Sequence, residues 1–334
     1  MRVPSLMSWR PVFGWIAALA LGVTILSALP RRGGAAVPEF TPPGREARLA
    51  ALGPLDALTP AARRIYADET GFSPIPKPKA NDWLANHRED GQTFAEFLTQ
   101  DRNRPDAKRK VIYLQPLGAI PAEVTPVLER LRAFSQIYFG LETRLGEARG
   151  LETFRITRRV NAHTGKPQLL AGDLLDVLRR KLPADAFCLL GVTCDDLYPD
   201  PAWNFVFGMA SLTERVGVYS LARYDEAFWG AQRPADHATV LLRRTFKVMA
   251  HETGHMFGIE HDTVYHCLMN GSNHLGETDA APLHLGPLSL RKLQQAVGFD
   301  PIARYRALEA VYLEAGLTVE ADWVEARLKV LAGG

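Results

Sequence analysis

The chain has 334 residues, of which 39 are Lys or Arg and 37 are Asp or Glu, giving a formal net charge of +2; 47% are hydrophobic. This composition excludes a wholly disordered, collagen-like or coiled-coil chain. It also argues against a nucleic-acid partner, because no excess of basic residues is present to neutralise phosphates. Three cysteines are too few for a disulfide-stapled fold.

The first 36 residues form a separate segment. No charged residue occurs from Pro11 to Pro30, and Arg2 and Arg10 precede this apolar run. As a helix, residues 12–29 would span about 27 Å, close to the thickness of a bilayer core. Basic residues before such a run favour a cytoplasmic N-terminus and transfer of the body across the membrane. We therefore expect an exported protein, with residues 1–36 as either a membrane anchor or a cleaved signal peptide.

The rest of the chain divides into an N-terminal extension (37–105), a catalytic domain (106–300) and a C-terminal helical tail (301–334). The extension is rich in Pro, Gly and Ala, with a helical patch at 47–68 and an extended stretch at 73–79. In the catalytic domain, hydrophobic patterns predict both strands and helices, which indicates an α/β or α+β fold. Strands are expected at 111–116, 154–161, 186–193, 204–209 and 215–221, and helices at 122–139, at 172–182, from Asp236 onward and over most of 288–331.

The helix that begins after Asp236, its expected N-cap, ends in the segment His251-Glu-Thr-Gly-His255-Met-Phe-Gly258-Ile-Glu-His261. His251 and His255 are four residues apart, so their imidazoles lie on one face, one turn apart, and can bind one Zn²⁺. Gly258 can adopt a left-handed conformation that ends the helix, so that His261 returns as a third ligand. Three neutral imidazoles leave one position for water, whose pKa the metal lowers toward about 7.

Glu252 follows the first of these histidines and is predicted to be the general base, which takes a proton from the zinc-activated water and later delivers it to a leaving amine. This chemistry hydrolyses a carbonyl bond, most naturally a peptide bond, so the expected substrate is a peptide or protein. Met269 follows His261 by eight residues, in a position typical of the Met-turn of metzincins. A lone methionine is otherwise more often a core residue.

Beyond the zinc motif, the sequence resembles the archaemetzincin (archaelysin) family of metzincin zinc peptidases, over about residues 70–300. The segments that carry the resemblance are 75–78, 82–84, 112–115, 195–199, 203–208, 215–224, 269–279 and 282–293. The resemblance implies a metzincin-like zincin fold, with a twisted mixed β-sheet, an active-site helix and a small helical C-terminal subdomain. It also implies that the strand at 204–209 or at 215–221 forms the upper rim of the cleft, where an extended peptide could add to it.

The sequence departs from this family at one point. The resemblance implies a second, structural zinc held by four cysteines, but the corresponding positions here are Asp262, Cys267, Gly286 and Ser289. Glycine offers no ligating side chain and serine is a poor zinc ligand, whereas closed structural sites favour thiolates. We therefore expect one catalytic zinc per chain and no structural zinc.

Other polar residues have simpler interpretations. Cys188 and Cys194 are expected to be free thiols, because six residues of extended strand would separate them by about 20 Å. Asp195 and Asp196 are expected to form a polar turn after a buried strand. The predicted function is thus that of a zinc metallopeptidase, a hydrolase, in which the N-terminal segment is the expected point of membrane contact. The alternative is a zinc-bearing binding protein of the cell envelope with little or no peptidase turnover.

Overall fold

The computed structural model describes residues 39–333. The apolar run between Pro11 and Pro30 lies outside these residues. Within 39–333, no helix is both long and apolar enough to cross a membrane. The helices are α1 (Arg45–Ala51), α2 (Pro60–Ala67), α3 (Trp83–Asn86), α4 (Phe94–Thr99), α5 (Thr125–Phe139), α6 (Ala171–Arg179), α7 (His237–Met256), α8 (Leu275–Ala280), α9 (Pro287–Val297), α10 (Pro301–Glu314) and α11 (Thr318–Ala332), with 3₁₀ turns η1 (Ala222–Tyr224) and η2 (Glu226–Trp229). The strands are β1 (Val111–Leu117), β2 (Thr143–Leu145), β3 (Arg158–Val160), β4 (Pro167–Leu170), β5 (Ala186–Thr193), β6 (Asp196–Tyr198), β7 (Gly208–Ser211) and β8 (Val216–Ser220).

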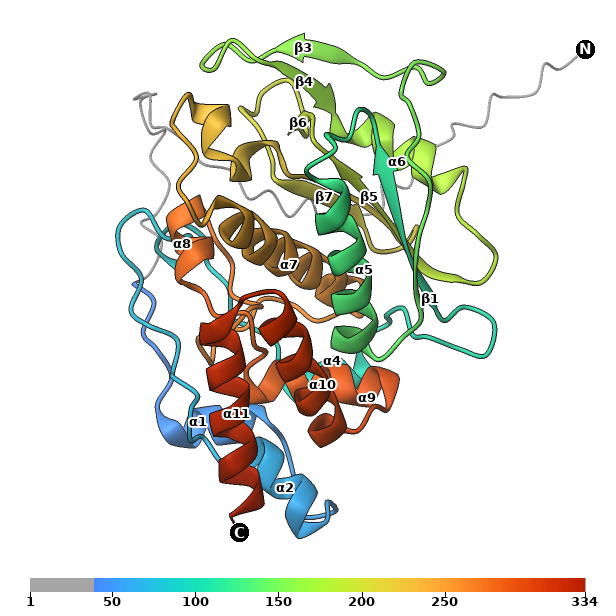
Figure 1. Ribbon diagram of the computed structural model, residues 1–334. Coiled ribbons are helices and arrows are strands. Elements are labelled where there is room, and N and C mark those ends of the chain that lie inside the picture. The colour runs from blue at the N-terminus through green and yellow to red at the C-terminus, as the bar shows by residue number, and fades with distance from the viewer. Residues whose placement is uncertain (1–38, 334) are drawn as a thin grey trace, which may run out of the picture.

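The main sheet of the described residues has five strands in the order β2-β1-β5-β8-β7. The first four are parallel, and β7 pairs antiparallel with β8 at one edge. A smaller sheet, in the order β3-β4-β6, lies above it in Figure 1. This arrangement confirms the predicted α+β class, and it places β7, rather than β8, at the sheet edge.

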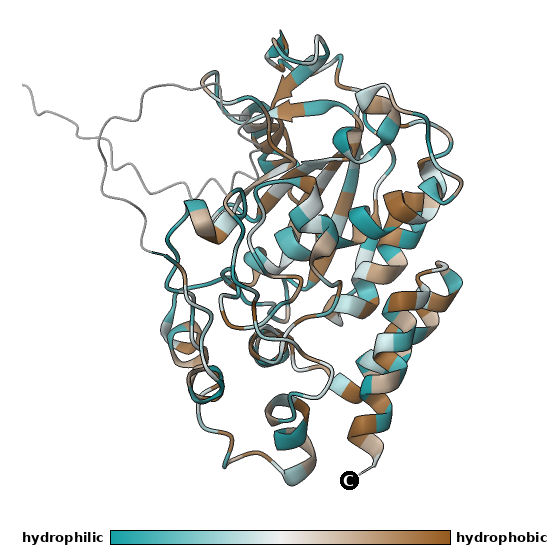
Figure 2. Ribbon diagram, turned by 90° about the vertical axis from the view of Figure 1, so that its left-hand side faces the viewer, coloured by the Kyte–Doolittle hydropathy of each residue, from teal (hydrophilic) through white to brown (hydrophobic). Residues whose placement is uncertain are grey.

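Helices cover both faces of the main sheet. Leu114 and Leu190 belong to the core cluster formed with α5 and α7, whereas Leu189 and Val218 belong to a second cluster formed with α6. This division follows from the alternation of side chains along each strand. The central strands of the main sheet are mainly hydrophobic in Figure 2, while the helices that face solvent alternate between hydrophobic and hydrophilic residues.

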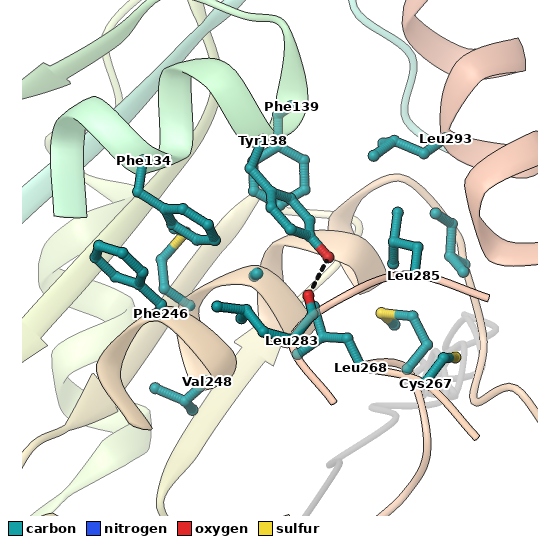
Figure 3. Packing of buried hydrophobic residues seen from close by; sticks show 14 of the residues in the cluster. Phe134, Tyr138, Phe139, Phe246, Val248, Cys267, Leu268, Leu283, Leu285 and Leu293 are labelled. Atoms are coloured by element: carbon teal, nitrogen blue, oxygen red, sulfur yellow. Dashed lines mark hydrogen bonds between the residues drawn. The ribbon is translucent and has the colours of Figure 1, made fainter. Parts of the chain in front are cut away.

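Aromatic packing joins α5 to α7 (Figure 3). The rings of Phe134 and Phe246 stack with their centroids 4.0 Å apart, and the Tyr138 hydroxyl donates a hydrogen bond to the Leu283 carbonyl oxygen at 3.1 Å. Aromatic pairs of this kind contribute about 0.5–1.5 kcal/mol beyond their buried area. They fix α7 between the sheet and the C-terminal segment.

The N-terminal extension packs into the same core as the catalytic domain. Phe72, Phe94 and Phe97 are buried in the main cluster, together with residues of α7 and α9. Helices α2 and α4 contact α9, and α11 contacts α2. In Figure 1, α1 and α2 accordingly lie beside α9, α10 and α11, below α7.

Several predicted elements differ from the structure. The helical patch at 47–68 is two helices, α1 and α2, because Gly53 has a φ of +69° and Pro54 disfavours helical geometry in the residue before it. The strand predicted at 154–161 is reduced to β3, and the one predicted at 204–209 is displaced to β7. Helix α7 begins after Asp236 as predicted, but the Asp236 side chain makes no capping hydrogen bond.

The polar turn expected at Asp195 and Asp196 is wrong for Asp196. Asp196 begins strand β6 and is only 3% exposed. The Arg223 side chain donates two hydrogen bonds to its carboxylate, from Nε at 2.7 Å and from a terminal nitrogen at 2.8 Å. Because these contacts satisfy the charge, the residue can be buried. Cys188 and Cys194 are free, as expected.

Candidate metal centre

The C-terminal half of α7 brings the predicted histidines together. His251 and His255 lie one helical turn apart, and the chain returns after α7 to place His261 beside them. One ring nitrogen from each histidine lies within 4.8 Å of the other two. The Nε2 atoms of His251 and His255 are 3.0 Å apart. Two nitrogens bound to one tetrahedral zinc at 2.0–2.1 Å would be separated by about 3.4 Å, so the spacing suits a shared metal ion.

The other ring nitrogen of each histidine is hydrogen-bonded to an oxygen. His251 Nδ1 lies 2.9 Å from the Leu268 carbonyl oxygen, and His255 Nδ1 lies 2.6 Å from that of Ile259. A carbonyl oxygen can only accept, so Nδ1 carries the proton and Nε2 keeps its lone pair. Burial, reinforced by the neighbouring His261, lowers the pKa of His251 to about 3 and keeps the imidazole neutral. This is the tautomer and charge state that a zinc ligand needs.

Gly258 and Met269 lie where the chain turns around the histidines. Gly258 has a φ of +78°, and α7 ends at Met256 just before it. Met269 is fully buried beneath α7, so close that a Cβ on Gly254 would approach the Met269 sulfur to 2.7 Å. The absence of a side chain at Gly254 therefore allows the Met269 turn to pack directly against the helix that carries the ligands.

The Glu252 side chain extends from α7, one residue after His251. It is only 3% exposed, and neither of its side-chain oxygens has a hydrogen-bond partner among residues 39–333. Burial raises the pKa of Glu252 to about 8. A buried carboxyl group is costly, and a carboxyl group with a perturbed pKa near possible metal ligands is a candidate functional residue.

Glu89 also contacts the site, although no local sequence pattern indicates this contact. Its Oε1 lies 2.8 Å from Nδ1 of His261. Glu89 belongs to the N-terminal extension, 172 residues before His261, in a polar run (His87-Arg-Glu-Asp90) that resembles any solvated loop. A groove of about 540 Å³ beside His255 and His261 is lined in part by Glu89 and by Leu212, which follows β7.

The four positions corresponding to the structural zinc ligands also meet in space. Ser289 Oγ donates to Asp262 Oδ2 at 2.9 Å, and a Cβ on Gly286 would lie 3.4 Å from both Asp262 Oδ2 and Cys267 Cβ. The other oxygen of Asp262 accepts from two backbone amides, those of Val264 and Tyr265. Within residues 39–333, Asp262 and Cys267 belong to no cluster of three metal-ligating side chains.

Cys267 is fully buried in the main hydrophobic cluster, part of which Figure 3 shows. Burial raises the pKa of the Cys267 thiol well above its ordinary value, and the nearby Asp262 acts in the same direction. The thiolate form that binds zinc is therefore strongly disfavoured here.

Two other groups of possible ligands have partners within the protein. One consists of Asp82, His274 and Glu277, and the other of Asp225, Glu226 and His237. Glu277 accepts hydrogen bonds from the backbone amides of Trp83 and Asn273, and His274 accepts one from the Glu277 amide. In the second group, arginines pair with both carboxylates. These contacts explain both groups without a metal ion.

Three histidines that converge on and just after a helix, with a buried glutamate following the first of them, define a metal-dependent hydrolase of the zincin class. The model of peptidase family M54 matches residues 162–295. Archaemetzincin-2 of Macaca fascicularis is 39% identical over 71% of this chain and 73% of its own length, and archaemetzincin-1 of Homo sapiens is 31% identical over 76% and 57%, respectively. The solved archaemetzincin of Methanopyrus kandleri is 26% identical, with a TM-score of 0.45 over 58% of this chain and 99% of its own.

The chain therefore belongs to the archaemetzincins and is a zinc metallopeptidase of family M54. The family predicted from the sequence is confirmed, as is the metzincin-like fold with its mixed sheet above the active-site helix. Its substrates are accordingly peptides or proteins.

Proposed function

We propose that this protein hydrolyses peptide bonds with a zinc ion held by His251, His255 and His261 and with Glu252 as the general base. The observation that carries the proposal is the convergence of three imidazole nitrogens from His251, His255 and His261, with the buried carboxyl group of Glu252 following the first of them on the same helix. Bound zinc supplies a Lewis acid that makes a water molecule acidic enough to lose its proton near neutral pH.

The side chains of this site have distinct tasks. The three histidines would bind the zinc through Nε2. The orientation of each ring is fixed because its Nδ1 is hydrogen-bonded to an oxygen. Glu252 takes the proton from the attacking water and returns it to the amine that leaves. No side chain or backbone group within 39–333 is hydrogen-bonded to its two oxygens, so none competes for that proton.

The sheet edge offers a place for the substrate backbone. Among residues 39–333, strand β7 pairs with β8 on one side and has no neighbouring strand on the other, and such an edge can accept an added strand. Leu212, directly after β7, lines the groove beside His255. We propose that an extended peptide lies along β7 and passes the zinc in this groove.

We further propose that the protein is exported, because the apolar run preceded by Arg2 and Arg10 has the pattern of a signal peptide or membrane anchor. Fractionation of cells that produce the full chain tests this. Activity confined to the cytoplasmic fraction would contradict it.

The ligand assignment is tested by His255→Ala. Removing one of three imidazoles should reduce bound zinc from about one per chain to a small fraction and abolish hydrolysis of a mixed peptide library. His163→Ala, which alters an exposed histidine, should keep both properties. Full zinc retention in His255→Ala would contradict the assignment. A wild-type protein that binds zinc but cleaves no peptide would instead support the alternative, a zinc-bearing binding protein.

We expect a single zinc per chain. Asp262, Gly286 and Ser289 replace three of the four thiolates of the structural site. Asp262 accepts three hydrogen bonds from the protein and Cys267 is buried. Mass spectrometry of metal in extensively dialysed protein should give a ratio near one, unchanged in Cys267→Ala. A ratio near two that falls to one in this variant would show that substitute ligands complete the second site.

A further inference from the structure

The third histidine is held differently from the other two. The Nδ1 atoms of His251 and His255 bond to the backbone carbonyl oxygens of Leu268 and Ile259, close by in the same part of the chain. Nδ1 of His261 instead lies 2.8 Å and 3.1 Å from the two carboxylate oxygens of Glu89. The His261 side chain is 6% exposed and that of Glu89 is 24% exposed. This charged partner comes from the N-terminal extension, outside the 162–295 region that the family model matches.

The segment that carries Glu89 is attached to the site at both ends. On one side, the Trp83 amide donates to the Glu277 carboxylate at 3.0 Å, and the Trp83 indole lies so close to Gly271 that a Cβ there would meet it at 2.4 Å. The same indole meets the His261 ring edge-on, with centroids 5.3 Å apart. The ring of His87 stacks on the indole at 3.8 Å.

On the other side of Glu89, Gln92 ties the segment to the turn that follows α7. Its Nε2 donates to the Gly258 carbonyl oxygen at 3.1 Å, and the buried Lys292 ammonium donates to the Gln92 carbonyl oxygen. Gln92 itself is only 5% exposed. Glu89 therefore lies between two fixed points, Trp83 and Gln92, and its position relative to His261 is set by packing rather than by chance contact in a loop.

From this geometry we infer that Glu89 is a positioning residue of the zinc site, and that the N-terminal extension is therefore part of the catalytic unit. The inference rests on the proposed zinc ligands. His261 lies beyond the end of α7, so the helix does not fix the position of its backbone as it does for His251 and His255. The carboxylate of Glu89 holds the proton on Nδ1, directs Nε2 toward the other two imidazoles and makes the ring a stronger donor to a cation.

The test is the zinc dissociation constant of the full chain, measured by competition with a chromophoric chelator. Loss of a carboxylate partner of a metal-bound histidine typically weakens metal binding by about 10–100-fold, which we expect for Glu89→Ala. The zinc dissociation constant of Glu89→Gln should lie between those of Glu89→Ala and the wild type. The amide oxygen can still accept a hydrogen bond from Nδ1 of His261, but it carries no charge. Asp90→Asn is the matched control: Asp90 is the next residue, its side chain is 87% exposed and its ion-pair partner is Arg88.

Two further measurements separate positioning from folding. The metal-free forms of wild type, Glu89→Ala and Glu89→Gln should unfold at similar temperatures. The absorption spectrum of the Co²⁺-substituted protein should change in Glu89→Ala and not in Asp90→Asn, since the spectrum reports ligand geometry directly. An unchanged zinc dissociation constant in Glu89→Ala would overturn the inference. An equal loss of zinc affinity in Asp90→Asn would also overturn it, because it would show that negative charge near the site matters rather than the contact between Glu89 and His261. These results do not depend on peptide turnover, so they remain informative even if the proposed hydrolysis fails.

Discussion

Glu252→Gln is expected to lower kcat for peptide hydrolysis by about 10²–10⁴-fold, the usual contribution of a general base, while zinc stays bound at one per chain. The amide matches the carboxyl group in size, so the buried site keeps its shape. The amide group, however, cannot accept the proton of the attacking water. Because neither Glu252 oxygen has a hydrogen-bond partner in the described part of the chain, the change breaks no hydrogen bond there.

The comparison needs two further variants. Glu252→Asp keeps the carboxyl group but withdraws it by one methylene, so its kcat should lie between those of wild type and Glu252→Gln. Glu147→Gln alters an exposed glutamate and should behave as wild type. Initial rates and bound zinc should be measured on the same samples. A kcat within a few-fold of wild type in zinc-loaded Glu252→Gln would exclude Glu252 as the base.

Elements with a strong local pattern could be predicted from the sequence. All eight residues of β5 are buried, and the apolar run from Ala186 to Thr193 predicted its limits. Helix α7 was predicted from apolar residues at helical spacing and from the histidine motif at its end. Strands β2, β4 and β6 are only three or four residues long, and none was predicted. Such short strands exist because a neighbouring strand pairs with them, which local patterns do not record.

The site shows the same division between local and long-range information. His251, Glu252 and His255 share one helix, so spacing alone placed them together. Glu89 reaches His261 from 172 residues away, and one more Glu in a polar loop carries no mark of that contact. Asp196 was misjudged for the same reason: two acidic residues before Leu-Tyr-Pro suggest a solvated turn, and only the folded chain reveals that Arg223 lies against the second of them.

Arg223→Ala is expected to lower the free energy of unfolding by about 3–5 kcal/mol, because it leaves a buried charge without its partner. The side chains of Arg223 and Asp196 are each 2% exposed, and the guanidinium also lies over the ring of Phe205, 3.5 Å from its centroid. After the substitution, Gln168 is the remaining side chain that donates to the Asp196 carboxylate, at 2.8 Å. The Leu197 backbone amide also donates to this carboxylate, at 3.1 Å, but neutral donors do not balance the buried charge.

The matched control is Arg233→Ala, which breaks an ion pair with Asp225 near the surface, where the Arg233 side chain is 43% exposed. Pairs this exposed contribute about 0–1 kcal/mol, so the two arginine variants should differ several-fold in their effect. Urea unfolding at a fixed zinc concentration measures both. The double variant Asp196→Asn/Arg223→Met should regain part of the loss, because it removes the uncompensated charge while filling most of the arginine's volume. If Arg223→Ala were no more destabilising than Arg233→Ala, the Asp196 carboxylate would have to find other partners or water, and β6 would not depend on this ion pair for its place in the fold.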